Sequence, residues 1–393
     1  MSVVRGTVAA LATTTVTVLP VFLTGGLAVQ IGGELGFDPA GLGLVVALFF
    51  GVSALASLPG GWLVERYGAV VTSRLGVLGA ATTMLCVAAF ARSYASFVAI
   101  LLCAAWCNVI GQLAANLTLA HVIPPARLGM SFGIKQCAIP LATLLAGAAV
   151  PAIALTAGWR WAYVAGAALA LGALAVGPRA AAAGTRGGPV PGERATAALA
   201  VLGIAAGLAA ASSCALGIFL VASAVDDGVD PGTAGLVLTL GSVVGLAMRL
   251  LHGWLADRRS GGHIAVVAGS LLLGGFGVAL LAVPGTVPLI VGTVLGYGLG
   301  WAWPGLLQFA VVRLNPSAPA AASAIVQTGV YAGGFGGPVG FGLLAAHIGF
   351  TTAWLVAAAV MVGAAGLMVL GRRMLVAHRV ARRPVPAAAR AVG

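Results

Sequence analysis

The six residues GWLVER at positions 61–66 return as GWLADR at positions 253–258, a shift of 192 residues in a chain of 393. A shift one residue shorter aligns Gln136 with Gln327. A repeat at about half the length of a chain indicates two copies of one structural unit. We therefore expect the two halves of this protein to have similar folds.

The composition indicates that the solvent of this chain is a lipid bilayer. Hydrophobic residues make up 61% of the sequence, charged residues make up 7%, and the mean hydropathy is +1.10. A soluble domain carries about 25% charged residues. A spanning helix needs about 20 apolar residues, whereas the strands of a barrel would alternate in polarity, so we predict an all-α membrane protein with twelve transmembrane helices. These helices are expected at residues 7–31, 41–63, 72–91, 95–121, 129–154, 160–176, 196–224, 233–255, 263–283, 287–311, 320–346 and 350–371.

Residues 177–195 separate the twelve segments into two groups of six. This stretch is rich in Pro, Gly and Ala and has no long apolar run, which is typical of a linker. We expect a six-helix bundle at 1–176, a cytoplasmic linker at 177–195, a second six-helix bundle at 196–371 and a basic cytoplasmic tail at 372–393. The first apolar segment exceeds the core of about 7 to 15 residues that a signal peptide has, so we expect it to be retained.

The arginines predict which side of the membrane each loop occupies, because short loops rich in Lys and Arg stay in the cytoplasm. With the N-terminus inside, the outer loops hold only Arg92 and Arg160 among the loop arginines. The net charge of +12 therefore reflects topology and contact with anionic lipids, and it does not indicate nucleic-acid binding. We expect a multi-pass protein of the cytoplasmic membrane with both termini in the cytoplasm. The outer loops also hold the acids Glu34, Asp38, Asp226, Asp227 and Asp230.

The segment GWLVERYG at residues 61–68, after the second helix, resembles the signature loop of the major facilitator superfamily. Its weaker copy at residues 253–259 follows the eighth helix, which is the family's second position for this loop. The resemblance covers essentially the whole chain and implies the family's fold, two parallel-repeat six-helix bundles, and its activity, secondary transport. The chain departs from the family pattern at Ala69-Val70, where a basic pair is usual, and at Cys107, where an Arg is usual in the fourth helix.

Both copies of the loop contain an acid followed by an arginine. An acid at the cytoplasmic end of a helix can pair with Arg and with the positive N-terminus of a neighbouring helix, which holds two bundles together in one state and releases them in the other. Glu65 with Arg66, and Asp257 with Arg258, are the predicted gating residues. The alternative is that these four are ordinary charges that flank a membrane.

Two basic residues, Lys135 in the fifth helix and Arg249 in the eighth, fall inside apolar segments, whereas every acid lies in a loop or at a helix end. Unpaired charge is strongly disfavoured inside a membrane, so a shared anionic ligand is the predicted partner of both. Snorkelling of the two side chains to the headgroups is the alternative. By its position ahead of Gly253 and Asp257, Arg249 also resembles the Arg that binds substrate carboxylate in the monocarboxylate transporters and the oxalate/formate exchanger.

Further polar and aromatic residues lie on helical faces that can line a central path or bond neighbouring helices, and these two roles remain open. Asn108, Gln112 and Asn116 are spaced four apart in the fourth helix, and Gln136 and Gln327 occupy equivalent positions of the repeat. The remaining candidates for substrate contact are Tyr331, Tyr297 and Trp301.

We predict a secondary transporter that moves a small solute, an organic or other small anion, by rocking of one bundle against the other. Coupling is expected to protons, carried on the substrate or on His252, or to a counter-anion. The alternative functions are a broad-specificity efflux pump for neutral or hydrophobic compounds and a transport-dead sensor on the same scaffold. The sequence has no Cys/His cluster, phosphate-binding loop or Ser/His/Asp constellation, so we expect a monomer with no cofactor, no metal and no enzymatic activity.

Overall fold

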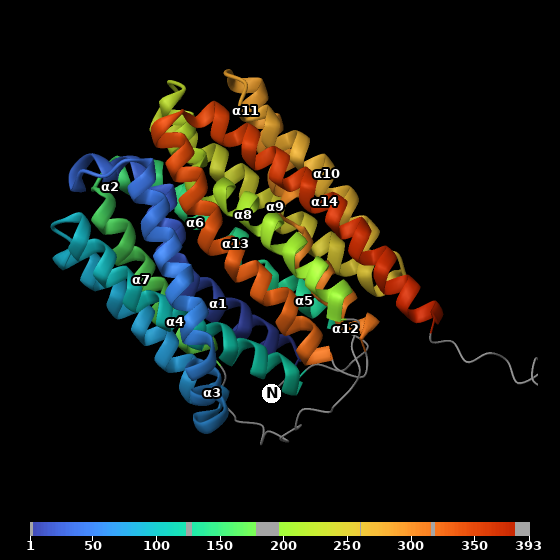
Figure 1. Cartoon of the computed structure of the whole chain (residues 1–393). Coiled ribbons are helices and arrows are strands. Elements are labelled where there is room, and N and C mark those ends of the chain that lie inside the picture. The colour runs from blue at the N-terminus through green and yellow to red at the C-terminus, as the bar shows by residue number, and fades with distance from the viewer. Residues whose placement is uncertain (1–2, 123–127, 178–195, 260, 316–318, 382–393) are drawn as a thin grey trace, which may run out of the picture.

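The computed structural model of the protein describes residues 3–122, 128–177, 196–259, 261–315 and 319–381 (Figure 1). Within these ranges all regular secondary structure is helical, which confirms the all-α prediction. The predicted linker from residue 178 onward and the end of the tail, residues 382–393, lie outside the described residues. The first half forms α1 (Val3–Gly26), α2 (Ala28–Leu35), α3 (Pro39–Phe90), α4 (Tyr94–Val122), α5 (Leu128–Gln136), α6 (Ala138–Ala149), the π-helical turn η2 (Val150–Ala154) and α7 (Trp159–Val176). The second half forms α8 (Thr196–Asp226), α9 (Pro231–Arg258), α10 (His263–Leu280), α11 (Thr286–Leu295), the π-helical turn η3 (Gly296–Gly300), α12 (Trp303–Leu314), α13 (Pro319–His347) and α14 (Phe350–Ala381).

Helices occupy all twelve expected positions in the described residues. Eleven helical segments are long and apolar enough to cross a membrane, and α13, with 29 residues, exceeds the roughly 20 residues that a span needs. The segments expected at 41–63 and 72–91 are joined in the single helix α3, which bends at Gly68 with φ at +77°. Glycine adopts this angle at little cost, so the last glycine of GWLVERYG makes the turn between the second and third spans.

The second helix of each half begins with the same cap. The carboxylate of Asp38 accepts a hydrogen bond from the N–H of Gly41 at 2.8 Å, and that of Asp230 accepts one from the N–H of Thr233 at 3.1 Å. Each Asp precedes a proline that starts its helix. These carboxylates satisfy N–H groups that the first turn leaves without partners.

The first and sixth helices of each half are joined by a buried hydrogen bond. In the first half, the hydroxyls of Tyr163 on α7 and Thr24 on α1 lie 2.9 Å apart. In the second half, the indole N–H of Trp354 on α14 donates to the hydroxyl of Ser223 on α8 at 2.8 Å. Tyr163 and Trp354 occupy equivalent positions of the repeat. Each half therefore has its own polar contact, at the same position, between its first and sixth spans.

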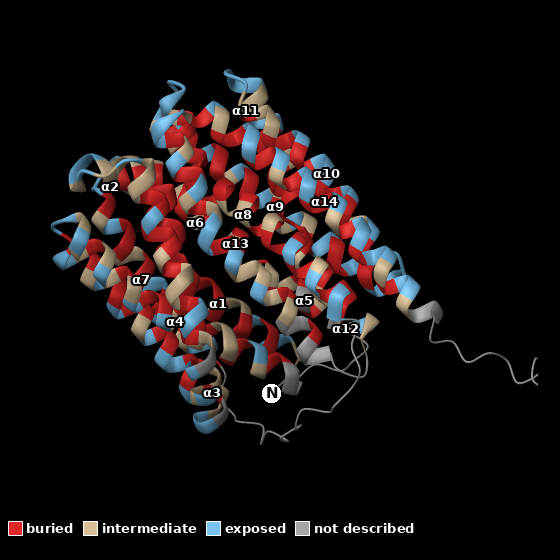
Figure 2. Ribbon diagram, in the orientation of Figure 1, coloured by how far each residue is buried: buried red, intermediate tan, exposed pale blue. Residues whose placement is uncertain are grey.

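Buried residues run through the interior of the molecule and exposed residues lie along the outer faces of its helices (Figure 2). Many of the exposed side chains are large and apolar, such as Leu55 (80% exposed), Phe90 (66%) and Phe276 (59%). In water such a surface would promote association. Lipid tails are as apolar as these side chains, so the outward faces suit a bilayer. The two halves meet mainly through α3 with α13 and through α5 and α6 with α9.

The last helix is longer than the apolar pattern suggested. α14 continues beyond Gly371, where the last segment was expected to end, as far as Ala381. Arg372 and Arg373 therefore belong to a helix that extends past the predicted membrane span.

On the side that we predict to be outer, three helices are linked through Glu34, which follows the first span. The carboxylate accepts hydrogen bonds from Arg160 and from the indole of Trp159, both at 2.7 Å. Arg160 also donates to the carbonyl of Ala91 at 2.9 Å. The hydrogen bond from Arg160, and then that from Trp159, hold the pKa of Glu34 below its ordinary value.

Glu34→Gln should lower the thermal stability of the protein slightly at neutral pH, by less than about 1 kcal/mol, because the ion pair is exposed. The folded-state pKa of Glu34 lies below its unfolded-state value. The carboxylate therefore stabilises the fold above the unfolded-state pKa, and this contribution disappears as the pH falls through the folded-state pKa. The difference in melting temperature between the native protein and the variant should close on acidification. A control, Asp226→Asn, should not lower the melting temperature, and a difference for Glu34→Gln that is the same at every pH would contradict the prediction.

Candidate functional site

The tenth span is broken in its middle, and this break builds the site. The chain runs as α11 to Leu295, continues as the π-helical turn η3 to Gly300, and resumes as α12 at Trp303. Pro304 in the first turn of α12 has no N–H to offer the preceding turn. The carbonyl of Gly300 instead accepts a hydrogen bond from the hydroxyl of Ser213 on α8 at 3.0 Å. A π-helical turn next to irregular backbone frequently marks a functional site in a span.

Arg249 on α9 lies against this break and is 1% exposed. Its Nη2 donates to the carbonyl of Trp301 at 2.7 Å, and its guanidinium lies 5.6 Å from the centre of the Trp301 ring. Its Nε and Nη1 are buried without a hydrogen-bond partner. One turn further along α9, Nδ1 of His252 lies 3.3 Å from the carbonyl of Ala302. The broken helix thus presents two carbonyls to two basic side chains. The guanidinium of Arg249 still has N–H donors that no acceptor satisfies.

Trp301 places this site at the junction of the two bundles. Its ring lies 5.9 Å from that of Phe22 on α1 and 5.4 Å from that of Tyr297. The hydroxyl of Tyr297, which is fully buried, donates to the carbonyl of Leu216 on α8 at 3.1 Å. The polar group of Tyr297 is therefore occupied within the protein, whereas the ring of Trp301 lies between Arg249 and the first bundle.

The fifth and eighth spans touch along their length. A Cβ at Gly133 would lie 3.1 Å from the carbonyl oxygen of Arg249, and a Cβ at Gly147 would lie 2.6 Å from that of Gly235. Between these points, the hydroxyls of Thr143 and Ser242 are 2.7 Å apart and both residues are fully buried. The first bundle is therefore in backbone contact with the helix that carries Arg249.

Lys135 on α5 is buried, at 8% exposure. Gly133 lies against α9, and the thiol of Cys137 lies 3.8 Å from the carbonyl of Leu246 on α9. Lys135 is two residues from each, a rotation of about 200°, so its side chain leaves α5 on the side away from α9. The structure thus brings the helices of Lys135 and Arg249 together and leaves their charged groups without a direct contact.

The predicted polar stripe of α4 divides by burial. Asn108 is 4% exposed and its side-chain oxygen has no hydrogen-bond partner, Gln112 is half-buried, and Asn116 is exposed. Only Asn108 has the unpaired buried polar atom that a ligand would satisfy.

The remaining polar candidates lie on α5 and α13. Gln327 accepts a hydrogen bond from Gln308 on α12 at 3.0 Å, and Tyr331, one turn further along α13, is half-buried. Gln136 is half-buried at the end of α5. No hydrogen bond between Gln136 and Gln327 is found in the described part of the chain.

The gating candidates lie beside the Gly68 bend of α3 and at the C-terminal end of α9. Asp257 accepts a hydrogen bond from the N–H of Met130, in the first turn of α5, at 3.1 Å. Arg258 does not pair with Asp257, as its guanidinium lies 3.9 Å from the Trp254 ring. The exposed Arg66 likewise faces Trp62, at 5.3 Å. The side chain of Glu65 lies outside the described residues.

Sequence reasoning missed the backbone carbonyls of Trp301 and Ala302 and the pair Thr143–Ser242. The run YGLGWAWP at residues 297–304 carried a signal for the break, because two glycines with a proline just beyond them weaken a helix. The hydroxyl pair carried none, since it joins residues 99 positions apart. Within the described ranges, no three His, Cys, Asp or Glu side chains are grouped to share a metal ion.

The sequence model of the Major Facilitator Superfamily matches residues 8–199 and 202–391. No curated protein matches this chain. The two matched ranges meet at residues 200–201, near the start of α8, and together they cover nearly the whole chain. These matches and the eleven candidate spans of the described residues together show that the chain belongs to the major facilitator superfamily and is a multi-pass membrane protein that transports a small solute.

Proposed function

We propose that this transporter carries a small anion, in the simplest case an organic carboxylate, and that Arg249 binds it. One observation supports this most directly, namely a fully buried guanidinium with two nitrogens that lack hydrogen-bond partners. A buried charge without a partner is disfavoured by several kcal/mol. The planar fork of an arginine matches the two oxygens of a carboxylate, which would supply both the missing bonds and the missing charge.

The location of Arg249 also supports a role in transport. It lies beside the broken tenth span, and Trp301 connects that span to α1 of the first bundle. A ligand held there would contact both bundles, which is the condition for coupling binding to their relative motion. We assign Lys135 the lesser role of a second positive charge, since its side chain points away from α9. Protons or a counter-anion are the proposed coupling species.

The proposed mechanism is a rocking of residues 1–176 against residues 196–371 in the cytoplasmic membrane, with both termini in the cytoplasm. At the predicted cytoplasmic end, the carboxylate of Asp257 caps α5 of the other bundle. The positive end of the α5 dipole favours this contact. The contact must break for the cytoplasmic ends of α5 and α9 to separate, so we propose it as a gate.

Asp257→Asn should slow transport several-fold and leave the affinity for substrate nearly unchanged, because the charge stabilises one end state and does not touch the ligand. Transport rates in proteoliposomes and binding to the purified protein measure the two effects. Asp227→Asn, which removes an exposed carboxylate at the opposite side, is the control and should transport at the native rate. Unchanged transport by Asp257→Asn would show that this residue is only a flanking charge.

A cavity in the second bundle favours export of neutral or hydrophobic compounds as the second candidate function. It has a volume of about 650 Å³ and lies between α8, α13 and α14, lined mainly by Gly and Ala. Ser212 in its wall is 2% exposed, and the Ser212 hydroxyl has no hydrogen-bond partner. An apolar ligand with one polar group would suit this cavity.

A thermal-shift screen of the purified protein distinguishes the two candidates, because a bound ligand stabilises the native state in proportion to occupancy. Anion transport predicts stabilisation by small carboxylates and none by uncharged compounds of the same shape. Stabilisation by hydrophobic compounds alone would replace the anion proposal with the second candidate.

A further inference from the structure

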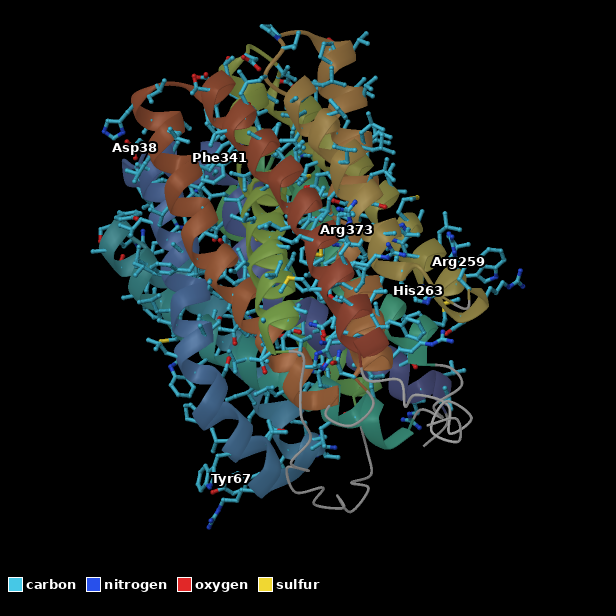
Figure 3. All side chains as sticks on the ribbon, turned by 45° about the vertical axis from the view of Figure 1, so that its right-hand side comes forward. Asp38, Tyr67, Arg259, His263, Phe341 and Arg373 are labelled. Carbon is cyan, nitrogen blue, oxygen red and sulfur yellow. The ribbon has the colours of Figure 1, made fainter. Side chains whose placement is uncertain are left out.

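A second pocket, of about 230 Å³, lies at one end of the second bundle, and Arg249 is not among the residues of its wall. It is formed where α10 begins, α12 ends and α14 extends past the apolar segment. Its wall includes Gly262, which caps α10, His263 of α10, Arg313 of α12, and Arg372 and Leu375 of α14. The pocket exists because α14 continues as a helix beyond Gly371, since two of these wall residues belong to that extension. Figure 3 shows His263 beside Arg259 at this end of the molecule.

The charges in this pocket are all positive. Arg313 and Arg372 line it, and none of the residues in its wall is acidic. Arg313 donates to the carbonyl of Arg259 at 3.4 Å, and its guanidinium lies 5.9 Å from the Phe309 ring. The ion pair between Glu34 and Arg160, at the other end of the protein, is the only one among the described residues. Neither pocket arginine is therefore neutralised by a carboxylate in the described part of the chain.

The N-terminus of α10 adds positive potential to the same pocket. α10 is 18 residues long, and its N-cap, Gly262, has no side chain to bond the N–H groups of the first turn. The first turn of a helix combines free N–H donors with the positive end of the helix dipole, and this combination attracts anions. Gly261, Gly262, His263 and Ile264 all contribute to the pocket wall, so this turn borders the space.

His263 supplies an independent sign of a missing partner. The residue is 6% exposed, and its Nε2 is buried without a hydrogen-bond partner. Its ring packs edge to face against Phe309, at 5.2 Å, the same ring that Arg313 faces. Buried side-chain nitrogens normally have a hydrogen-bond partner, and this one has none among the described residues.

We propose that this pocket binds a phosphate group. A phosphate has several acceptor oxygens and at least one negative charge. It can therefore accept hydrogen bonds from two arginines, an imidazole and the N–H groups of a helix N-terminus, and it neutralises part of their positive charge. The volume corresponds to several water molecules, since one water occupies about 30 Å³ in the liquid, and a phosphate group fits this space. The pocket lies at the ends of three spans, at the depth of lipid headgroups, on the side that we predict to be cytoplasmic. The phosphate belongs either to an anionic phospholipid or to a soluble phosphate compound.

The test measures thermal stabilisation of the full-length protein in lipid nanodiscs. One arm compares phosphatidylglycerol with phosphatidylcholine, and the other titrates inorganic phosphate into phosphatidylcholine discs. The double variant Arg313→Gln/Arg372→Gln should weaken binding of the phosphate source at least tenfold. The control Arg74→Gln/Arg373→Gln changes the net charge equally on the same predicted side with residues outside the pocket, and it should bind as the native protein does. The conservative variant Arg313→Lys/Arg372→Lys keeps the charge and should retain part of the affinity.

Each outcome decides the proposal. Stabilisation by phosphatidylglycerol that is lost only in the Gln double variant assigns the site to a lipid headgroup. Stabilisation by inorganic phosphate that is lost in the same variant assigns it to a soluble phosphate. Equal loss in the Arg74/Arg373 control would reduce the effect to general charge attraction and would overturn the proposal, as would equal stabilisation of all variants. If the Gln double variant does not fold, the Lys variant and the control decide between these outcomes by the same comparison.

Discussion

Arg249→Gln should abolish anion binding and transport at normal expression. The substitution removes a charged, two-pronged donor from a dry site, and a charge-assisted hydrogen bond of this kind contributes about 1.5 to 3 kcal/mol, or roughly 10- to 150-fold in affinity. The loss of two such bonds, from the nitrogens that now lack partners, would weaken the binding of a micromolar ligand until it could no longer be detected. Thermal-shift titration with small carboxylates, followed by uptake into proteoliposomes, measures both effects.

Variants with graded chemistry separate binding from a structural role. Arg249→Lys should restore little binding, because an ammonium keeps the charge and loses the fork. Lys135→Gln should weaken the binding of dianions more than the binding of monoanions. Lys135→Arg should keep part of the affinity if only the charge of residue 135 matters. Arg249 also bonds the carbonyl of Trp301, so Arg249→Gln can loosen the broken tenth span. If Arg249→Gln loses thermal stability but takes up every tested anion normally, the residue is structural and the apolar cavity beside Ser212 becomes the better candidate site.

Gly147→Ala should shift the protein away from the conformation described above by about 1 to 3 kcal/mol, or about 5- to 150-fold in population. The added Cβ would lie 2.6 Å from the carbonyl oxygen of Gly235 and 2.9 Å from the backbone nitrogen of Thr239. Backbone atoms of a helix cannot step aside as a flexible side chain can. The fifth and eighth spans must therefore separate on the predicted outer side, which favours the state that is open there.

A cysteine placed at Val150 reports this opening. Val150 is fully buried, and its side chain lies 2.7 Å from the position of a Cβ at Gly235. In a background without other cysteines, Val150→Cys should react with a membrane-impermeant thiol reagent faster when Gly147→Ala is present, and net transport should fall. The matched control is Gly172→Ala, where an added Cβ meets no atom within 4 Å. Equal labelling with and without Gly147→Ala would show that this contact does not set the balance of states.

Several features could be predicted because they depend on local sequence. Helix number and type follow from apolar run length, since a span in lipid must satisfy its own backbone hydrogen bonds. The division into halves follows from the repeat of GWLVER as GWLADR. Arg249 could be singled out because a cation inside an apolar segment can be recognised from the sequence alone. For the same reason Asp257 could be proposed to meet a helix N-terminus, although only the structure identifies that helix as α5.

The sequence by itself determined an all-α membrane protein with two similar halves and an arginine inside the apolar segment of the eighth predicted span. Tertiary structure alone decided which groups surround that arginine. The carbonyls of Trp301 and Ala302 become acceptors because η3 and Pro304 interrupt a helix, and their distance from Arg249 and His252 depends on how α9 packs against that interruption. Likewise, Lys135 was expected to share a ligand with Arg249, and the rotation of α5 about its axis, with Gly133 and Cys137 against α9, decides how Lys135 is placed relative to Arg249. The periodicity of apolar residues indicates which face of a helix is buried only when the opposite face is polar. These helices are apolar on all sides, so the periodicity does not specify how one helix is rotated against the next.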